Sequence, residues 1–183
     1  MVLPIWSKSG EIWLALACDV VRRVVADTGP INYLVIIGHI HVLSTMFGRV
    51  SIPEVVRAEL GHSRSPDVVQ RWIASHPPWL VVQPDPRSPI VQLPFLDDGE
   101  REALLLARSL NADLVLMDDR AGVAVAVSLG LAVIGTVGLL DLAARRGLID
   151  LPEAFGRLRA TSFRCRAAIY DEVLLRFHQD GAE

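Results

Sequence analysis

The fold is decided by Val24-Val25-Ala26-Asp27 and by Leu114-Val115-Leu116-Met117-Asp118-Asp119, two short apolar stretches that end in aspartate. Every residue before the acids is apolar, whereas a sheet with one face in water would show alternating polar positions. Continuous apolar strands are typical of a parallel sheet that is covered on both faces. The same reasoning predicts further strands at 50–52, 79–82 and 131–134.

Helical patterns lie between these strands. Thr28-Gly29-Pro30 is expected to turn the chain before an apolar helix, and Gly61, Gly130 and Gly147 are expected at helix ends. The alternation predicts an α/β three-layer sandwich with a central parallel sheet built from the strands that start at Val24, Val50, Leu114 and Leu131. The expected helices cover residues 31–37, 53–60, 67–75, 101–110, 121–129, 137–146, 152–159 and 166–177.

The length of 183 residues predicts one domain over residues 23–183, with residues 1–22 as an extension outside the core. The apolar run 12–18 is too short to span a bilayer, so we expect neither membrane insertion nor secretion. Cys18 and Cys165 lie far apart and form no metal-binding or disulfide pattern, which favours the cytoplasm. A net charge of −3 predicts that any nucleic-acid site is a local patch.

Acidic residues follow the strands at the positions where an α/β sheet binds its ligands, beyond the carboxyl ends. Asp27, Asp118 and Asp119 end two strands, Glu59 lies near the end of the helix after residues 50–52, and Glu100 lies in the first turn of another helix. Such carboxylates would repel each other unless a cation bound them. Oxygen ligands suit Mg²⁺ or Mn²⁺, and a cluster of this kind supports hydrolysis of phosphodiester bonds.

Each acid also has a purely structural interpretation, which the residues alone leave open. Aspartate and glutamate are common in turns, on solvated helix faces and at helix N-termini. The structural roles are a turn at Asp27-Thr28, a solvated helix position at Glu59, a capping box of Asp97 with Glu100, an N-cap at Asp98, and an N-cap at Asp118 or Asp119.

Four stretches, in order, resemble the motifs of PIN-domain proteins. The first two are Val24-Val25-Ala26-Asp27-Thr28-Gly29-Pro30, and Ile52-Pro53 with Glu59-Leu60. The third runs from Leu96 to Ala107 and contains Gly99-Glu100, and the fourth is Leu116-Met117-Asp118-Asp119-Arg120. Gly99-Glu100 and Gly135-Thr136-Val137-Gly138-Leu139-Leu140 are similar to the branch with the VapC-like toxins. The resemblance covers roughly residues 24–175.

The resemblance implies a metal-dependent endoribonuclease, a hydrolase of RNA phosphodiester bonds that uses Mg²⁺ or Mn²⁺. It implies Asp27, Glu59, Glu100 and Asp119 as catalytic residues, and Asp27, Glu100, Asp118 and Asp119 as metal ligands. Whether Asp118 or Asp119 is the main ligand stays open. Two positions depart from the family: the third acid is more often aspartate than glutamate, and Met117 stands where threonine or serine is frequent.

The same resemblance implies the toxin of a toxin–antitoxin pair, with RNA as substrate and a small antitoxin as partner. We also expect a homodimer, because the 51% hydrophobic content exceeds what such a core needs and the helices at 31–37 and 68–73 could present an apolar surface. The alternatives are a PIN nuclease of RNA processing without an antitoxin, and a degenerate PIN domain that only binds RNA or protein. A receiver or phosphatase domain is disfavoured, since it needs a lysine near the sheet and Lys8 precedes the fold.

Overall fold

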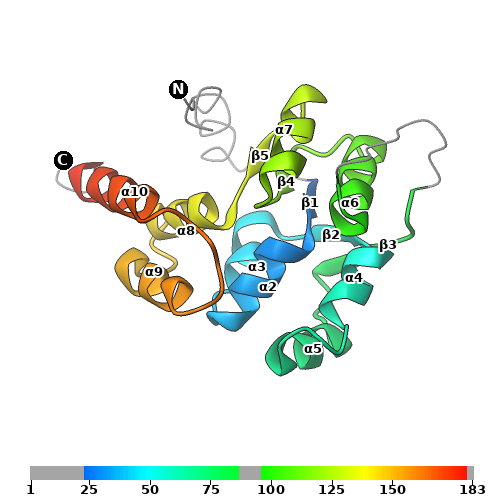
Figure 1. Cartoon of the computed structure of the whole chain (residues 1–183), viewed down its shortest axis with the longest axis horizontal. Coiled ribbons are helices and arrows are strands. Elements are labelled where there is room, and N and C mark those ends of the chain that lie inside the picture. Colours follow the sequence, from blue (N-terminus) through cyan, green and yellow to red (C-terminus); the bar gives the residue numbers. More distant parts are fainter. Residues whose placement is uncertain (1–22, 87–95, 181–183) are drawn as a thin grey trace.

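The structure is a computed structural model that describes residues 23–86 and 96–180. Its centre is a five-stranded sheet with the order β3-β2-β1-β4-β5, in which every pair of neighbours is parallel. The predicted α/β sandwich with a central parallel sheet is therefore confirmed (Figure 1). The strands are β1 (Val24–Ala26), β2 (Val50–Pro53), β3 (Leu80–Gln83), β4 (Leu114–Leu116) and β5 (Val133–Ile134).

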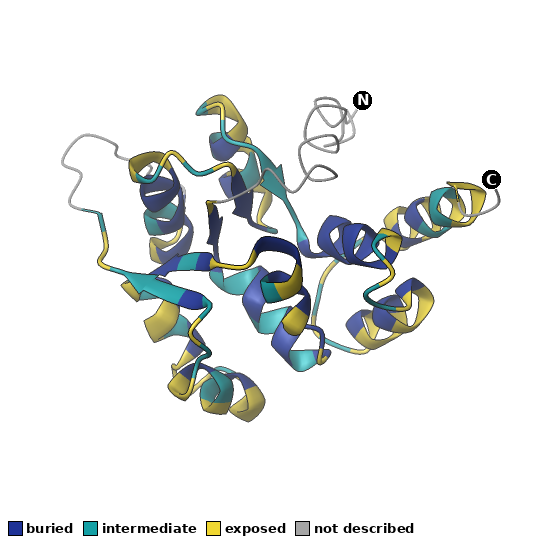
Figure 2. Cartoon of the chain, turned by 180° about the vertical axis from the view of Figure 1, so that it is seen from behind, coloured by how far each residue is buried: buried dark blue, intermediate teal, exposed yellow. Residues whose placement is uncertain are grey.

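Both faces of the sheet are covered, which explains why β1 and β4 carry no polar residue. Val25, Val115 and Met117 pack on one face against the helices α6 (Asp98–Ser109) and α7 (Arg120–Ser128). Val24 and Ala26 point to the other face, into the larger core. Figure 2 shows β1 and β4 buried at the centre, while the outer helices have exposed sides. The helices of the larger core are α2 (Thr28–Ile36), α3 (His41–Phe47), α4 (Glu54–Leu60), α5 (Asp67–Ala74), α8 (Thr136–Arg145), α9 (Leu151–Arg159) and α10 (Ala167–Asp180).

One local expectation was wrong, and one helix was not expected. Thr28 to Pro30 do not form a separate turn before the helix, because α2 already begins at Thr28. Proline is tolerated there, since the N–H groups of the first helical turn have no acceptor within the helix. Helix α3 was not expected from the sequence, because it has only seven residues. It lies between Gly38 and Gly48, two glycines whose positive φ angles are incompatible with a continuous helix. The strand expected at 79–82 is confirmed as β3, and it adds an edge strand to the four expected in the sheet.

The apolar side chains that were expected to offer a partner surface lie mostly in the core. Ile31, Leu34 and Ile37 are buried, as are Val69 and Ile73, whereas Val68 is exposed. The extension 1–22 and most of the loop expected between β3 and α6 lie outside the described residues. Across residues 23–86 and 96–180, no helix combines the length and the apolar character needed to cross a membrane.

Candidate active site

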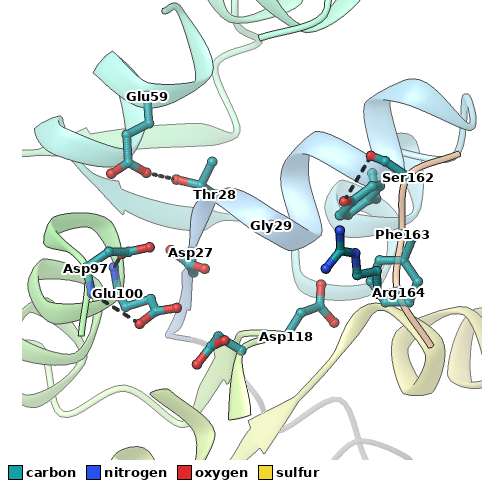
Figure 3. Close-up of a pocket in the computed structure, with 12 residues that line it drawn as sticks. Asp27, Thr28, Gly29, Glu59, Asp97, Glu100, Asp118, Ser162, Phe163 and Arg164 are labelled. Carbon is teal, nitrogen blue, oxygen red and sulfur yellow. Dashed lines mark hydrogen bonds between the residues drawn. The ribbon is translucent and has the colours of Figure 1, made fainter. Parts of the chain in front are cut away.

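An open pocket of about 460 Å³ lies at the carboxyl ends of β1 and β4 (Figure 3). The structure brings all five acids predicted from the sequence into this pocket, together with Asp97. The acidic lining residues are Asp27, Glu59, Asp97, Glu100, Asp118 and Asp119, and the others are Thr28, Gly29, Tyr33, Ser162, Phe163 and Arg164.

Asp27 is positioned by the pairing of β1 with β4. Ala26 lies opposite Leu116 in the register, and the backbone N–H of Asp27 donates to the Leu116 carbonyl at 3.0 Å. The strand order reverses at β1. Strands β2 and β3 lie on one side of β1, whereas β4 and β5 lie on its other side. Reversal points of this kind leave a crevice at the carboxyl ends of a parallel sheet.

Asp27 is 7% exposed, and its side chain makes no cap bond to helix α2, which it precedes. Burial, aided by the negative charges of Asp97, Glu100 and Glu59, raises its pKa to about 7, against a hydrogen bond from the Thr28 backbone that lowers it. A buried carboxylate whose neighbours are all acidic is costly to keep ionised. The site therefore favours binding a cation or a proton at Asp27.

Glu100 enters the pocket from the first turn of α6, where it has two roles. Asp97 is the N-cap, and its Oδ1 accepts from the Glu100 backbone N–H at 2.8 Å. Glu100 Oε2 accepts in return from the Asp97 backbone N–H at 3.4 Å, which completes a capping box. Burial and the charges of Asp97, Asp119 and Glu59 still raise the pKa of Glu100 to about 7. The predicted capping box is therefore confirmed, and Glu100 also lines the pocket, while the expected alternative cap, Asp98, instead pairs with Arg101.

The neighbours Asp118 and Asp119 are held in different ways. Asp118 accepts hydrogen bonds from the backbone N–H and the hydroxyl of buried Thr136, at 2.7 and 2.6 Å. Burial raises its pKa although both of these bonds lower it. Asp119 is exposed and caps α7 through Oδ1, which accepts from the backbone N–H groups of Ala121 and Gly122. The charge of Asp119 also raises the pKa of Glu100, so Asp119 faces the acidic cluster.

Glu59 reaches the pocket edge from the last turn of α4, and Thr28 connects it to β1. The Thr28 hydroxyl donates a short hydrogen bond to Glu59 Oε2 (Figure 3). Gly99 lies against the same carboxylate, since a Cβ at Gly99 would stand 2.5 Å from Glu59 Oε2. The absence of a side chain at Gly99 therefore allows the start of α6 to approach Glu59.

Two other glycines keep space around Asp118. A Cβ at Gly135 would stand 2.9 Å from Asp118 Oδ1. A Cβ at Gly29 would meet Asp118 Oδ2 at 3.4 Å and Asp27 Oδ2 at 3.9 Å, so Gly29 lies beside both carboxylates. These glycines belong to motifs noted in the sequence, and the structure shows that they make room for the acids.

The remaining wall comes from residues that the sequence analysis did not select. Tyr33 of α2 contacts Phe163 edge to face, with ring centroids 4.8 Å apart. Phe163, Ser162 and Arg164 belong to the α9–α10 linker (residues 160–166), more than 130 residues away from Asp27 along the chain. Asp97 was assigned only a capping role, although it also lines the pocket. A short linker with an aromatic residue next to arginine is the only sequence signal for this wall.

The acidic cluster offers oxygen ligands only, which fit Mg²⁺ or Mn²⁺ better than softer metals. Within the two described ranges, no three acidic, histidine or cysteine side chains already stand close enough around one point to hold an ion. Binding would therefore need small side-chain rotations or water ligands, and Mg²⁺ commonly keeps several waters. The raised pKa values of Asp27 and Glu100 show that their charged forms are costly here, and a cation near them would lower that cost.

Comparison with known proteins agrees with this geometry. A search of the curated proteins finds no significant match. A family model described as a PIN domain matches residues 23–179, which includes every strand of the sheet and all six pocket acids. Because this match covers most of the sequence, the chain belongs to the PIN-domain family.

Proposed function

We propose that this protein is a Mg²⁺- or Mn²⁺-dependent endoribonuclease that hydrolyses phosphodiester bonds of RNA. PIN domains are generally nucleases, which gives the class of reaction. The observation that carries the finer proposal is the group of six carboxylates in one open pocket, two of them buried with a pKa of about 7. Carboxylates that are costly to ionise near neutral pH are stabilised by a nearby cation, and these two fit that description.

Each acid has a role in the proposal. Asp27, Glu100, Asp118 and Asp119 would hold the metal, which neutralises charge on the phosphate and lowers the pKa of the attacking water. Glu59, fixed by the Thr28 hydroxyl at the pocket edge, would orient that water. Thr136 holds the Asp118 carboxylate toward the site through two hydrogen bonds.

The decisive variant is Asp27→Asn, which keeps the shape of the side chain and removes its charge. We expect cleavage of a single-stranded RNA with Mn²⁺ to fall at least ~100-fold, since metal affinity depends on the number of charged ligands. Stability without metal should be unchanged or higher, because a buried repulsive charge is gone. Asp98→Asn is the matched control, because the exposed side chain of Asp98 pairs with Arg101 and does not line the pocket. Cleavage by Asp27→Asn at the wild-type rate would refute the proposal.

A further part of the proposal is that the nuclease is a toxin, acting in the cytoplasm as a homodimer that a small antitoxin inhibits. The support is the VapC-like sequence around Gly99-Glu100 and Gly135-Thr136, and exposed apolar side chains on outer helices, such as Val127 and Leu175. Expression of the wild type should arrest growth of a host, whereas expression of Asp27→Asn should not. Growth without arrest, from a protein that cleaves RNA in vitro, would favour an RNA-processing nuclease instead.

A further inference from the structure

Among the described residues, Arg164 is the only basic one whose side chain lines the pocket. Its guanidinium extends from the α9–α10 linker toward the Asp118 carboxylate, on the opposite side of the pocket from Glu100 (Figure 3). Arg164 is exposed and, within the described part of the chain, makes no ion pair or hydrogen bond with its side chain. Arg159 and Arg157 of α9 pair with Asp171 and Glu153, whereas Arg166 of the same linker, which does not line the pocket, has no side-chain partner among the described residues either.

An unpaired guanidinium beside six carboxylates is poorly explained by a structural role. A guanidinium that served only to hold the linker would gain from a bidentate bond to a carboxylate. Arg164 instead keeps its donors free, while Asp118 is satisfied by Thr136. Arginine is suited to bind a phosphate through two parallel hydrogen bonds. The free donors are therefore available to an anion that enters the pocket.

The surroundings of Arg164 indicate which anion this is. Phe163 and Tyr33 form a partly exposed aromatic pair beside it, and both line the pocket. Proteins that bind single-stranded nucleic acid combine cations for the backbone with aromatic rings for the bases. The bases of a duplex are stacked inside the helix, so this combination selects a single strand.

We propose that Arg164 binds a backbone phosphate next to the cleaved bond of single-stranded RNA, while Phe163 and Tyr33 contact the adjoining base. Arg164 is then a substrate-positioning residue that complements the acids on the other side of the pocket. This inference rests on the proposed nuclease function, because it assigns the substrate contacts of the same pocket.

RNA binding tests the role of Arg164, and RNA cleavage separately tests the nuclease proposal on which it rests. Binding of a fluorescein-labelled single-stranded 12-mer RNA is measured by anisotropy with Mg²⁺, in the Asp27→Asn background so that the RNA stays intact. Arg164→Ala should weaken binding about tenfold, as expected for a lost charge-assisted bond to phosphate. It should also reduce the slope of log K against log salt by about 0.7, the effect of one phosphate contact in a single strand. Arg164→Lys should restore the slope but only part of the affinity, since lysine cannot bind in a bidentate manner.

Arg166→Ala is the matched control, because Arg166 is exposed in the same linker and does not line the pocket. Its affinity and salt slope should equal those of the parent, and the melting temperature of both alanine variants should be unchanged. Equal effects of Arg164→Ala and Arg166→Ala, including no effect of either, would overturn the inference. Failure of the nuclease proposal is a different result, namely RNA cleavage that survives Asp27→Asn in the otherwise wild-type protein.

Discussion

The two walls of the pocket are built in opposite ways. On the acidic wall, the backbone of β1, β4 and the start of α6 fixes buried carboxylates, and local bonds such as the Asp97–Glu100 capping box hold them. The other wall is a linker between two outer helices, where Phe163 contacts Tyr33 and Arg164 is exposed and unpaired within the described residues. Under the proposed function, the sheet would supply reactivity, while the linker between the peripheral helices would supply contacts to the substrate. Changes to the acidic wall should therefore have the larger effects.

The largest effect within this comparison is expected for Asp119→Asn. Asparagine caps helices as well as aspartate does, so α7 keeps its hydrogen bonds from Ala121 and Gly122. The loss of the charge that faces Glu100 should lower RNA cleavage about 100-fold, with the free energy of unfolding unchanged within about 1 kcal/mol. Parallel cleavage assays and thermal melts separate the two roles. Full cleavage by this variant would make Asp119 a helix cap only and leave Asp118 as the ligand.

A somewhat smaller effect is expected from pH on the metal-free protein. The pKa values of Asp27 and Glu100 are raised to about 7, from 3.8 and 4.5, so the folded state binds their protons more tightly than the unfolded state. Their contribution to stability is full below pH 3.8 and is lost as the pH rises through 7. Asp27→Asn removes the Asp27 part, so its stability relative to the wild type should rise by about 2–3 kcal/mol between pH 5 and pH 8.

Thermal melts of both proteins at the two pH values measure this difference directly. Groups such as His39, whose pKa is lowered by burial, occur in both proteins and cancel in the comparison. Mn²⁺ at pH 8 should raise the melting temperature of the wild type and have little effect on Asp27→Asn. A difference that does not change with pH would show that Asp27 is ordinarily ionised in the folded protein.

The smallest effect is expected where α6 approaches Glu59. Gly99→Ala places a methyl group against the end of the Glu59 side chain, which can rotate away at little cost in stability. Cleavage should fall about tenfold, an increase of about 1.4 kcal/mol in the barrier. Gly156→Ala is the matched control, because a Cβ there meets nothing within 4 Å. It should leave cleavage unchanged and stabilise α9 by about 0.5–1 kcal/mol. Equal rates for the two variants would remove Glu59 from the proposed site.

The central sheet and the acids that follow its strands were predictable because both depend on local patterns. Val24 to Ala26 and Leu114 to Leu116 contain only apolar residues, and parallel strands bring the residues after them to one edge. The capping box at Asp97 was visible for the same reason, since its partners are three residues apart. The structural and the site interpretations of Glu100 could not be separated in the sequence, because the same side chain completes the capping box and lines the pocket.

The linker wall could not be predicted, because no local pattern connects residues 160–166 with Asp27. Its place depends on how α9 and α10 pack, for example through the edge-to-face contact of Phe155 with Tyr170 at 5.0 Å. For a related reason, most of the apolar side chains expected at a partner surface belong to the core instead. An apolar face at Ile31 or Ile73 looks the same in the sequence whether another helix of the chain or a partner protein covers it.

Under the proposed function, the capping box of α6 would couple the start of a helix to metal binding. Glu100 Oε2 accepts a weak bond from the Asp97 backbone, at 3.4 Å, and the same carboxyl group lines the pocket. Fraying of the first turn of α6 would withdraw Glu100 from the cluster, so ion binding and helix fraying oppose each other by thermodynamic linkage. The amide hydrogens of this turn would then exchange with solvent at a rate that reports how much of the protein is loaded with metal.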